Sequence, residues 1–163
     1  MKKKGLGIVI IAITGFLLVA GIGSAAKQDV SIEATVQQAL ELTVSPSSID
    51  YGTVSPKGGP ESDGTYETEG TKANVKSSVN WQLKLSKSRD LTSGTNSIPS
   101  SRFTYGVNEG APRHEFQLSP GAQIKTGKQT NSQDVVVEYK LDVDWVDPSG
   151  TYTATHTYEL SAL

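Results

Sequence analysis

Few side chains in this sequence could carry out chemistry, and they are widely spaced. The two histidines, His114 and His156, stand far apart, and the chain contains no cysteine. This composition excludes thiol catalysis, disulfides and thiolate metal sites, and it does not supply the ligand set of a zinc site. His156 shares its parity with apolar neighbours, which predicts a partly buried residue of a strand. His114 is predicted to lie in a solvated turn.

The carboxylates with the most suggestive spacing are Asp142, Asp144 and Asp147. Asp142 and Asp144 would project from the same face of one strand, and Asp147 would follow in a turn. Crowded oxygen ligands of this kind are a candidate calcium site. The alternative is a charged sheet surface that prevents aggregation between sheet edges.

Other catalytic and nucleic-acid signals are absent from the sequence. No serine stands in a G-x-S-x-G elbow, and no glycine-rich phosphate loop precedes a predicted helix. Without Lys2, Lys3 and Lys4, the 15 basic residues fall to 12, against 17 acidic residues. No basic patch with interleaved aromatic residues indicates nucleic-acid binding. We therefore expect a protein that is not an enzyme, uses no cofactor and does not bind nucleic acid.

The elements that must position these side chains are predicted to be strands. Apolar and polar residues alternate with period two from Val30 onwards, as in strands with one buried face. The alternation is longest over residues 30–44, where one long N-terminal strand is predicted. Residues 135–145 and 152–160 are predicted to pair as a hairpin around a turn at 147–150. Further short strands are expected, one of them near Tyr51, with polar loops over 56–70, 86–101 and 125–133.

About seven or eight short strands without helical periodicity predict an all-β fold, an immunoglobulin-like antiparallel β-sandwich. We expect Trp81 and Leu83 to face the core, with Trp81 as its largest side chain. Tyr51 and Gly52 are expected to close one end of the core at a bulge. Trp145 ends its strand beside a turn and is expected to be the more exposed tryptophan.

The first 26 residues have the layout of an export signal. A basic start is followed by an apolar run over 6–22 and by small residues that end at Ala26. Cleavage after Ala26 would leave residues 27–163 as a single domain. The apolar run is close to the shortest length that spans a bilayer, so an uncleaved membrane anchor is an alternative. A cut before Leu6, at a site that resembles the one used by prepilin peptidases, would leave a pilin-like subunit with its N-terminal helix.

Two segments resemble secreted prokaryotic surface proteins. Residues 42–56, with Asp50-Tyr51-Gly52 in the middle, resemble the opening of many secreted prokaryotic sandwich proteins, and residues 75–83 resemble one of their strands. Trp81-Gln82-Leu83 is similar to the triplet of the WxL cell-surface domains, and Tyr158 stands where their second motif has a tryptophan. The WxL resemblance implies non-covalent attachment to a Gram-positive cell wall. Fimbrial and matrix-fibre subunits open in a comparable way.

These observations predict a non-catalytic structural or adhesive protein that is secreted or held at the cell surface. In the first form of this prediction it is a fibre or matrix subunit, in which residues 30–44 of one copy complete a sheet of another. In the second form it is a WxL-like module that binds a cell-wall polymer or another glycan. The expected partners are therefore copies of the chain or a wall polymer. The membrane is a partner only if residues 6–22 are retained.

Overall fold

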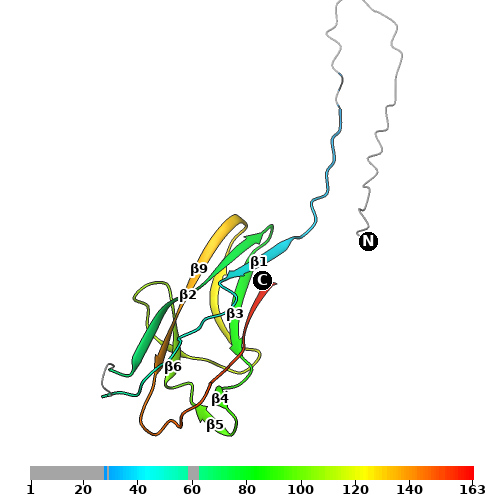
Figure 1. Cartoon of the computed structure of the whole chain (residues 1–163). Coiled ribbons are helices and arrows are strands. Elements are labelled where there is room, and N and C mark those ends of the chain that lie inside the picture. Colours follow the sequence, from blue (N-terminus) through cyan, green and yellow to red (C-terminus); the bar gives the residue numbers. More distant parts are fainter. Residues whose placement is uncertain (1–27, 29, 59–62) are drawn as a thin grey trace, which may run out of the picture. The chain divides into compact units, whose positions relative to one another are not determined.

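The computed structural model describes residues 28, 30–58 and 63–163, and all regular structure among them is β-strand (Figure 1). The prediction of an all-β fold is confirmed for this part of the chain. The strands are β1 (Leu40–Ser45), β2 (Thr65–Ser77), β3 (Trp81–Lys87), β4 (Leu91–Ser93), β5 (Asn96–Ile98), β6 (Phe103–Val107), β7 (His114–Glu115), β8 (Ala122–Gly127), β9 (Thr130–Asp142) and β10 (His156–Ala162).

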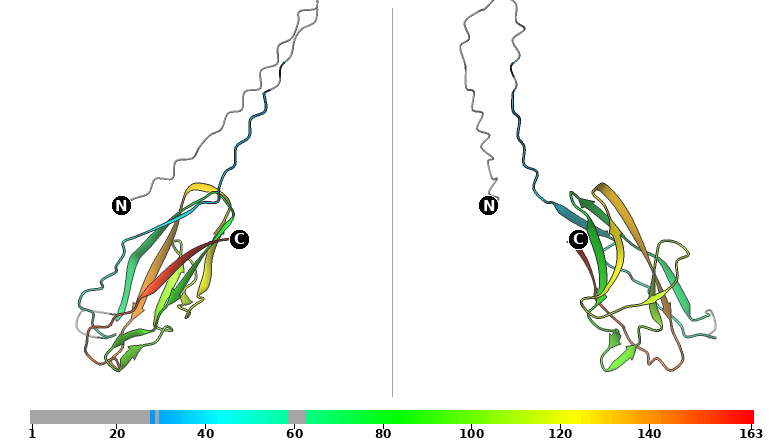
Figure 2. Two further views of the ribbon diagram at one scale, coloured as in Figure 1. Left: turned by 90° about the vertical axis from the view of Figure 1, so that its right-hand side faces the viewer. Right: turned by 180° about the vertical axis from the view of Figure 1, so that it is seen from behind.

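Two main antiparallel sheets form the domain. One has five strands in the order β1-β2-β9-β6-β7, and the other has three in the order β10-β3-β8. The strands β4 and β5 form a small separate hairpin. Both main sheets contribute side chains to one hydrophobic core, so the arrangement is β-sandwich-like (Figure 2).

The core follows from the period-two alternation of the two longest patterns. On β9, Val135 and Val137 are buried while the residues between and beside them are more exposed. On β3, Trp81, Leu83 and Leu85 are buried in the same alternating way. Because alternate residues of a strand face opposite sides, each sheet has one apolar face, and these faces share the core.

The long N-terminal strand predicted over residues 30–44 is wrong for residues 30–39, because β1 begins only at Leu40. Leu40 lies opposite Ser77, the last residue of β2. Ser78 then accepts a hydrogen bond from the Ala39 N–H through its hydroxyl and donates its own N–H to the Ala39 carbonyl. After Ser78 the chain turns into β3 of the other sheet, so β2 offers no edge to the residues before Ala39.

The predicted hairpin at the C-terminal end is also wrong. β9 ends at Asp142, and β10 pairs with β3 in the opposite sheet. β2 and β6 flank β9 on its two edges, so β9 has no edge available to β10. The turn at 147–150 therefore belongs to a connection between the sheets.

The predicted loops were too long, and one predicted strand does not form. β2 begins at Thr65, inside the predicted loop 56–70, and the β4–β5 hairpin lies inside 86–101. The predicted loop 125–133 contains the end of β8 and the start of β9. These stretches pair through their backbones although polar residues dominate them. Tyr51 packs against the core from a segment that belongs to no strand.

The predicted signal or anchor, residues 1–26, lies outside the described residues, and so does cleavage at Ala26. In the part of the chain that the structure describes, no helix has the length and apolar character needed to cross a membrane.

Candidate functional site

The three carboxylates of the candidate calcium site each make a different contact. Asp147 accepts two hydrogen bonds of 2.6 Å from the Arg102 guanidinium, and only 5% of its side chain is exposed. Hydrogen bonding from Arg102 lowers the pKa of the Asp147 carboxyl. Asp142 accepts a hydrogen bond of 2.8 Å from the Thr65 hydroxyl, and Asp144 accepts one of 2.7 Å from the next backbone N–H. Among the described residues, no group of three acidic, histidine or cysteine side chains could hold a metal ion.

The two histidines lie in different environments. On β10, His156 lies among aromatic rings, with centroid distances of 3.9 Å to Phe116 and 5.7 Å to Tyr139. Burial lowers its pKa to about 4, and the positive charge of Lys87 acts in the same direction. His156 is therefore a neutral ring of the core at neutral pH. His114 is exposed on β7.

Trp81 fills the end of the core where the chain passes between the sheets. It is fully buried, and its indole Nε1 donates a hydrogen bond of 2.9 Å to the Lys128 carbonyl. Lys128 belongs to the connection between β8 and β9, so this bond ties one sheet to the chain entering the other. A Cβ on Gly127 would lie 2.4 Å from the Trp81 ring, so the ring needs a glycine beside it. Leu83, two residues further along β3, is also fully buried.

Tyr51 and Gly52 lie in a turn instead of the expected bulge in a strand. The Gly52 N–H donates a hydrogen bond of 2.7 Å to the Asp50 carboxylate, and Gly52 has a φ of 65°. This left-handed conformation favours glycine, although there is open space for a Cβ. The turn directs the Tyr51 ring edge-on to Phe103, with centroids 6.4 Å apart, and burial raises the pKa of the Tyr51 phenol.

Trp145 lies in the turn after β9 and is 68% exposed. Its Nε1 donates a hydrogen bond of 2.8 Å to the Lys57 carbonyl, which fixes the position of the ring. The next residue, Val146, is 76% exposed. This turn therefore exposes two consecutive apolar side chains.

A second exposed apolar feature is the segment of residues 30–36, which we call the donor segment. Val30, Ile32 and Val36 are 80%, 89% and 85% exposed. They alternate with Ser31 and Thr35, so one parity of the segment is apolar and the other is polar. The segment belongs to no strand, although its pattern is that of a half-buried strand.

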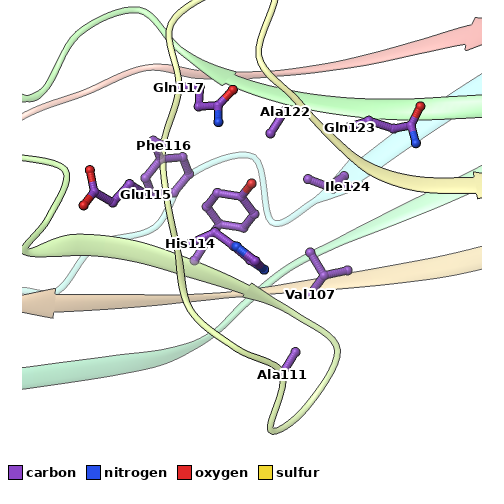
Figure 3. A pocket seen from close by; sticks show the side chains of 10 residues that line it. Val107, Ala111, His114, Glu115, Phe116, Gln117, Ala122, Gln123 and Ile124 are labelled. Atoms are coloured by element: carbon purple, nitrogen blue, oxygen red, sulfur yellow. The ribbon is translucent and has the colours of Figure 1, made fainter.

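A hollow of about 430 Å³ lies between the edges of the two main sheets, where β6 and β7 approach β8 (Figure 3). Figure 3 shows Val107 on one side of this hollow and Ile124 on the other, with Phe116 at one end. Gln123 lines its β8 side and His114 its β7 side. Glu115 and Gln117 also line the hollow, so its lining combines apolar and polar side chains.

The chain matches no protein-family profile, no curated protein and no solved structure. Its function must therefore be inferred from its own residues and geometry.

Sequence reasoning missed the hollow because it missed most of β8. Ile124 is the only large apolar residue of β8, and Lys125–Gly127 resemble a loop in composition. Pro120 and Gly121, just before the strand, are also typical of a loop. No signal in the sequence alone places β8 next to β7, because hydrogen bonds to β3 determine its position.

Proposed function

We propose that this protein is a non-catalytic structural subunit of an assembly at the cell surface or outside the cell, and that its copies join by strand addition. The observation that carries this proposal is the exposed apolar row of the donor segment. A strand added to the sheet of another copy would bury that row and pair backbone groups that form no ladder in the single chain.

The energetics favour reversible assembly that depends on concentration. Burial of each large apolar side chain contributes about 1.5–3 kcal/mol. Ordering the backbone opposes this by about 1–2 kcal/mol for each residue. The two effects are comparable for a short segment, so several contacts must form together.

We also propose that the two main sheets form an immunoglobulin-like sandwich. Two antiparallel sheets around one core support it, and so does the buried Trp81 on the middle strand of the smaller sheet. Such a sandwich has exposed sheet edges, which strand addition requires.

The contacts of the reactive side chains support a non-catalytic role. Asp147 is held by Arg102, and His156 is packed between rings, so neither side chain is available to a substrate. Catalysis would require converging polar groups in a cleft.

We also propose that the protein acts outside the cytoplasm, because residues 1–26 have the layout of an export signal. Intact-mass measurement of the protein from its own host separates the three forms. A start at Lys27 indicates a released domain, a start at Leu6 indicates a pilin-like subunit, and an intact Met1 indicates a tethered protein.

Two matched variants test assembly through the donor segment. Ile32→Asp places a charge on the apolar parity, and Ser31→Asp places the same charge on the polar parity of the neighbouring residue. We expect Ile32→Asp to abolish oligomers in size-exclusion chromatography and fibres in electron microscopy, and Ser31→Asp to retain them. A wild-type protein that stays monomeric at high concentration would contradict the proposal.

A second candidate function is binding to a cell-wall polymer or another glycan through Trp145. An exposed indole held in place by a hydrogen bond is a suitable stacking surface for a sugar ring. We expect the protein to pellet with purified cell wall and Trp145→Ala to lose this property. Leu118→Ala, which removes another exposed apolar side chain, is the control. Pelleting that is equal for both variants would contradict the role of Trp145.

A further inference from the structure

We propose that the donor segment of one copy adds to the outer edge of β8 in a second copy and turns its apolar row into the hollow. This inference rests on the proposed function, because it names the acceptor for the strand addition proposed there.

The arrangement of the sheet edges points to β8. On one side of the domain, β1 of the larger sheet lies near β10 of the smaller sheet. On the other side, β8 pairs with β3 on one edge and has no strand neighbour on its other edge among the described residues. The two-residue strand β7 offers too short an edge for a segment of this length.

The hollow beside β8 suits the pattern of the donor segment. Its walls include the side chains of Val107, Phe116 and Ile124, which would meet the apolar parity of an added strand. Gln123 is exposed and would lie on the same face as the polar parity of the donor. An added strand requires this combination of an apolar interior and a polar exterior.

The charges of the donor segment and of β8 with the connection after it are complementary. Between residues 28 and 39 the chain carries Asp29 and Glu33 and no basic residue. On the acceptor side, β8 carries Lys125 and the connection after it carries Lys128, whereas Glu115 lines the opposite side of the hollow. Complementary charges of this kind guide association and help to set the register.

The occupant that we propose is the donor segment of a second copy, because the segment and the edge of β8 are both open to a partner. Val30, Ile32 and Val36 are at least 80% exposed in the single chain, and the hollow beside β8 is unfilled by side chains. A chain that exposes both a strand-like segment and an open edge can pair the two by exchange between copies.

Cysteine pairing tests this inference directly, because the chain has no cysteine of its own. One preparation carries Ser31→Cys or Thr35→Cys in the donor segment. Two positions are used because the added strand could run parallel or antiparallel to β8. The other carries Gln123→Cys or Thr126→Cys on β8, both at exposed positions. The matched controls are Thr43→Cys on β1 and Thr157→Cys on β10, which are exposed on other edge strands.

The preparations are full-length chains expressed in their own host and purified in the form which that host produces. They are mixed at high concentration under mild oxidation, and linked peptides are identified by mass spectrometry. We expect disulfides between the donor and β8 to exceed those to β1 or β10 by about tenfold or more. Circular dichroism of each unlinked variant confirms that it is folded.

The outcomes separate this inference from the proposed function. Oligomers with links to Thr43→Cys or Thr157→Cys instead of β8 would overturn the choice of β8 and leave strand addition standing. Monomers without any link would overturn both. A disulfide within one monomer of the Ser31→Cys, Gln123→Cys double variant, without links between copies, would overturn exchange between copies.

Discussion

Arg102 and Asp147 form a two-pronged ion pair in which Nη1 donates to Oδ2 and Nη2 donates to Oδ1, each at 2.6 Å. Asp147 Oδ2 also accepts a hydrogen bond of 2.8 Å from the Asp144 N–H. The pair therefore ties the turn that carries Trp145 to the residue just before β6. The same carboxylate was a candidate calcium ligand, and its two oxygens are used to hold this turn.

Loss of the Arg102 side chain should destabilise the domain. Arg102→Ala leaves the nearly buried Asp147 carboxylate without its partner, and we expect the free energy of unfolding to fall by about 3 kcal/mol. Arg102→Lys should recover only part of this loss, because an ammonium group cannot make the two-pronged contact. Urea unfolding measures both values. Arg89→Ala, at an exposed arginine, is the control and should change stability little.

His156 should make the domain less stable in mild acid. Its folded pKa of about 4 lies below the unfolded value of about 6.5, so protons bind more readily to the unfolded chain. The stability is complete above pH 6.5 and is lost as the pH falls towards 4, by up to about 3 kcal/mol. His156→Phe should flatten this part of the stability curve. An unchanged slope in His156→Phe would show that other groups cause it, and His114→Gln serves as the control.

Gly127 and Trp81 should behave as a coupled pair. Gly127→Ala places a methyl group against the indole ring, and we expect a loss of about 1–3 kcal/mol. Trp81→Phe should relieve much of that clash in the double variant, so the two effects should not add. Gly106→Ala is the control, because the nearest atom to a Cβ there is 3.4 Å away. Additive effects of Gly127→Ala and Trp81→Phe would contradict the contact.

The Tyr158 hydroxyl should stabilise the contact between the two sheets. On β10, it lies 2.8 Å from the Tyr139 hydroxyl of β9 and is hydrogen-bonded to the Thr71 hydroxyl of β2. Tyr158→Phe leaves two partly buried hydroxyls with fewer partners, and we expect a loss of about 1–2 kcal/mol. Thermal or urea unfolding measures this loss. Tyr152→Phe removes an exposed hydroxyl bond and should cost less, so an equal loss in both variants would contradict the cross-sheet role.

Local alternation was sufficient to predict several parts of the fold. The all-β class, the buried faces of β3 and β9 and the burial of Trp81 follow from side chains that alternate along each strand. Trp145 is the more exposed tryptophan, but it lies in the turn after β9 and not at the end of the strand, where it was predicted. These features depend on residues that are close together in the chain, so the sequence alone is enough to predict them.

Only the tertiary structure decided which edges pair. β10 joins β3 because both edges of β9 are occupied, and residues 30–39 remain outside the sheets because β2 ends at Ser77. The hollow beside β8 and the pairing of Asp147 with Arg102 likewise bring together segments that are distant in the sequence. Alternation specifies which side of a strand is buried, but hydrogen-bond pairing between strands depends on which edges the rest of the fold leaves open.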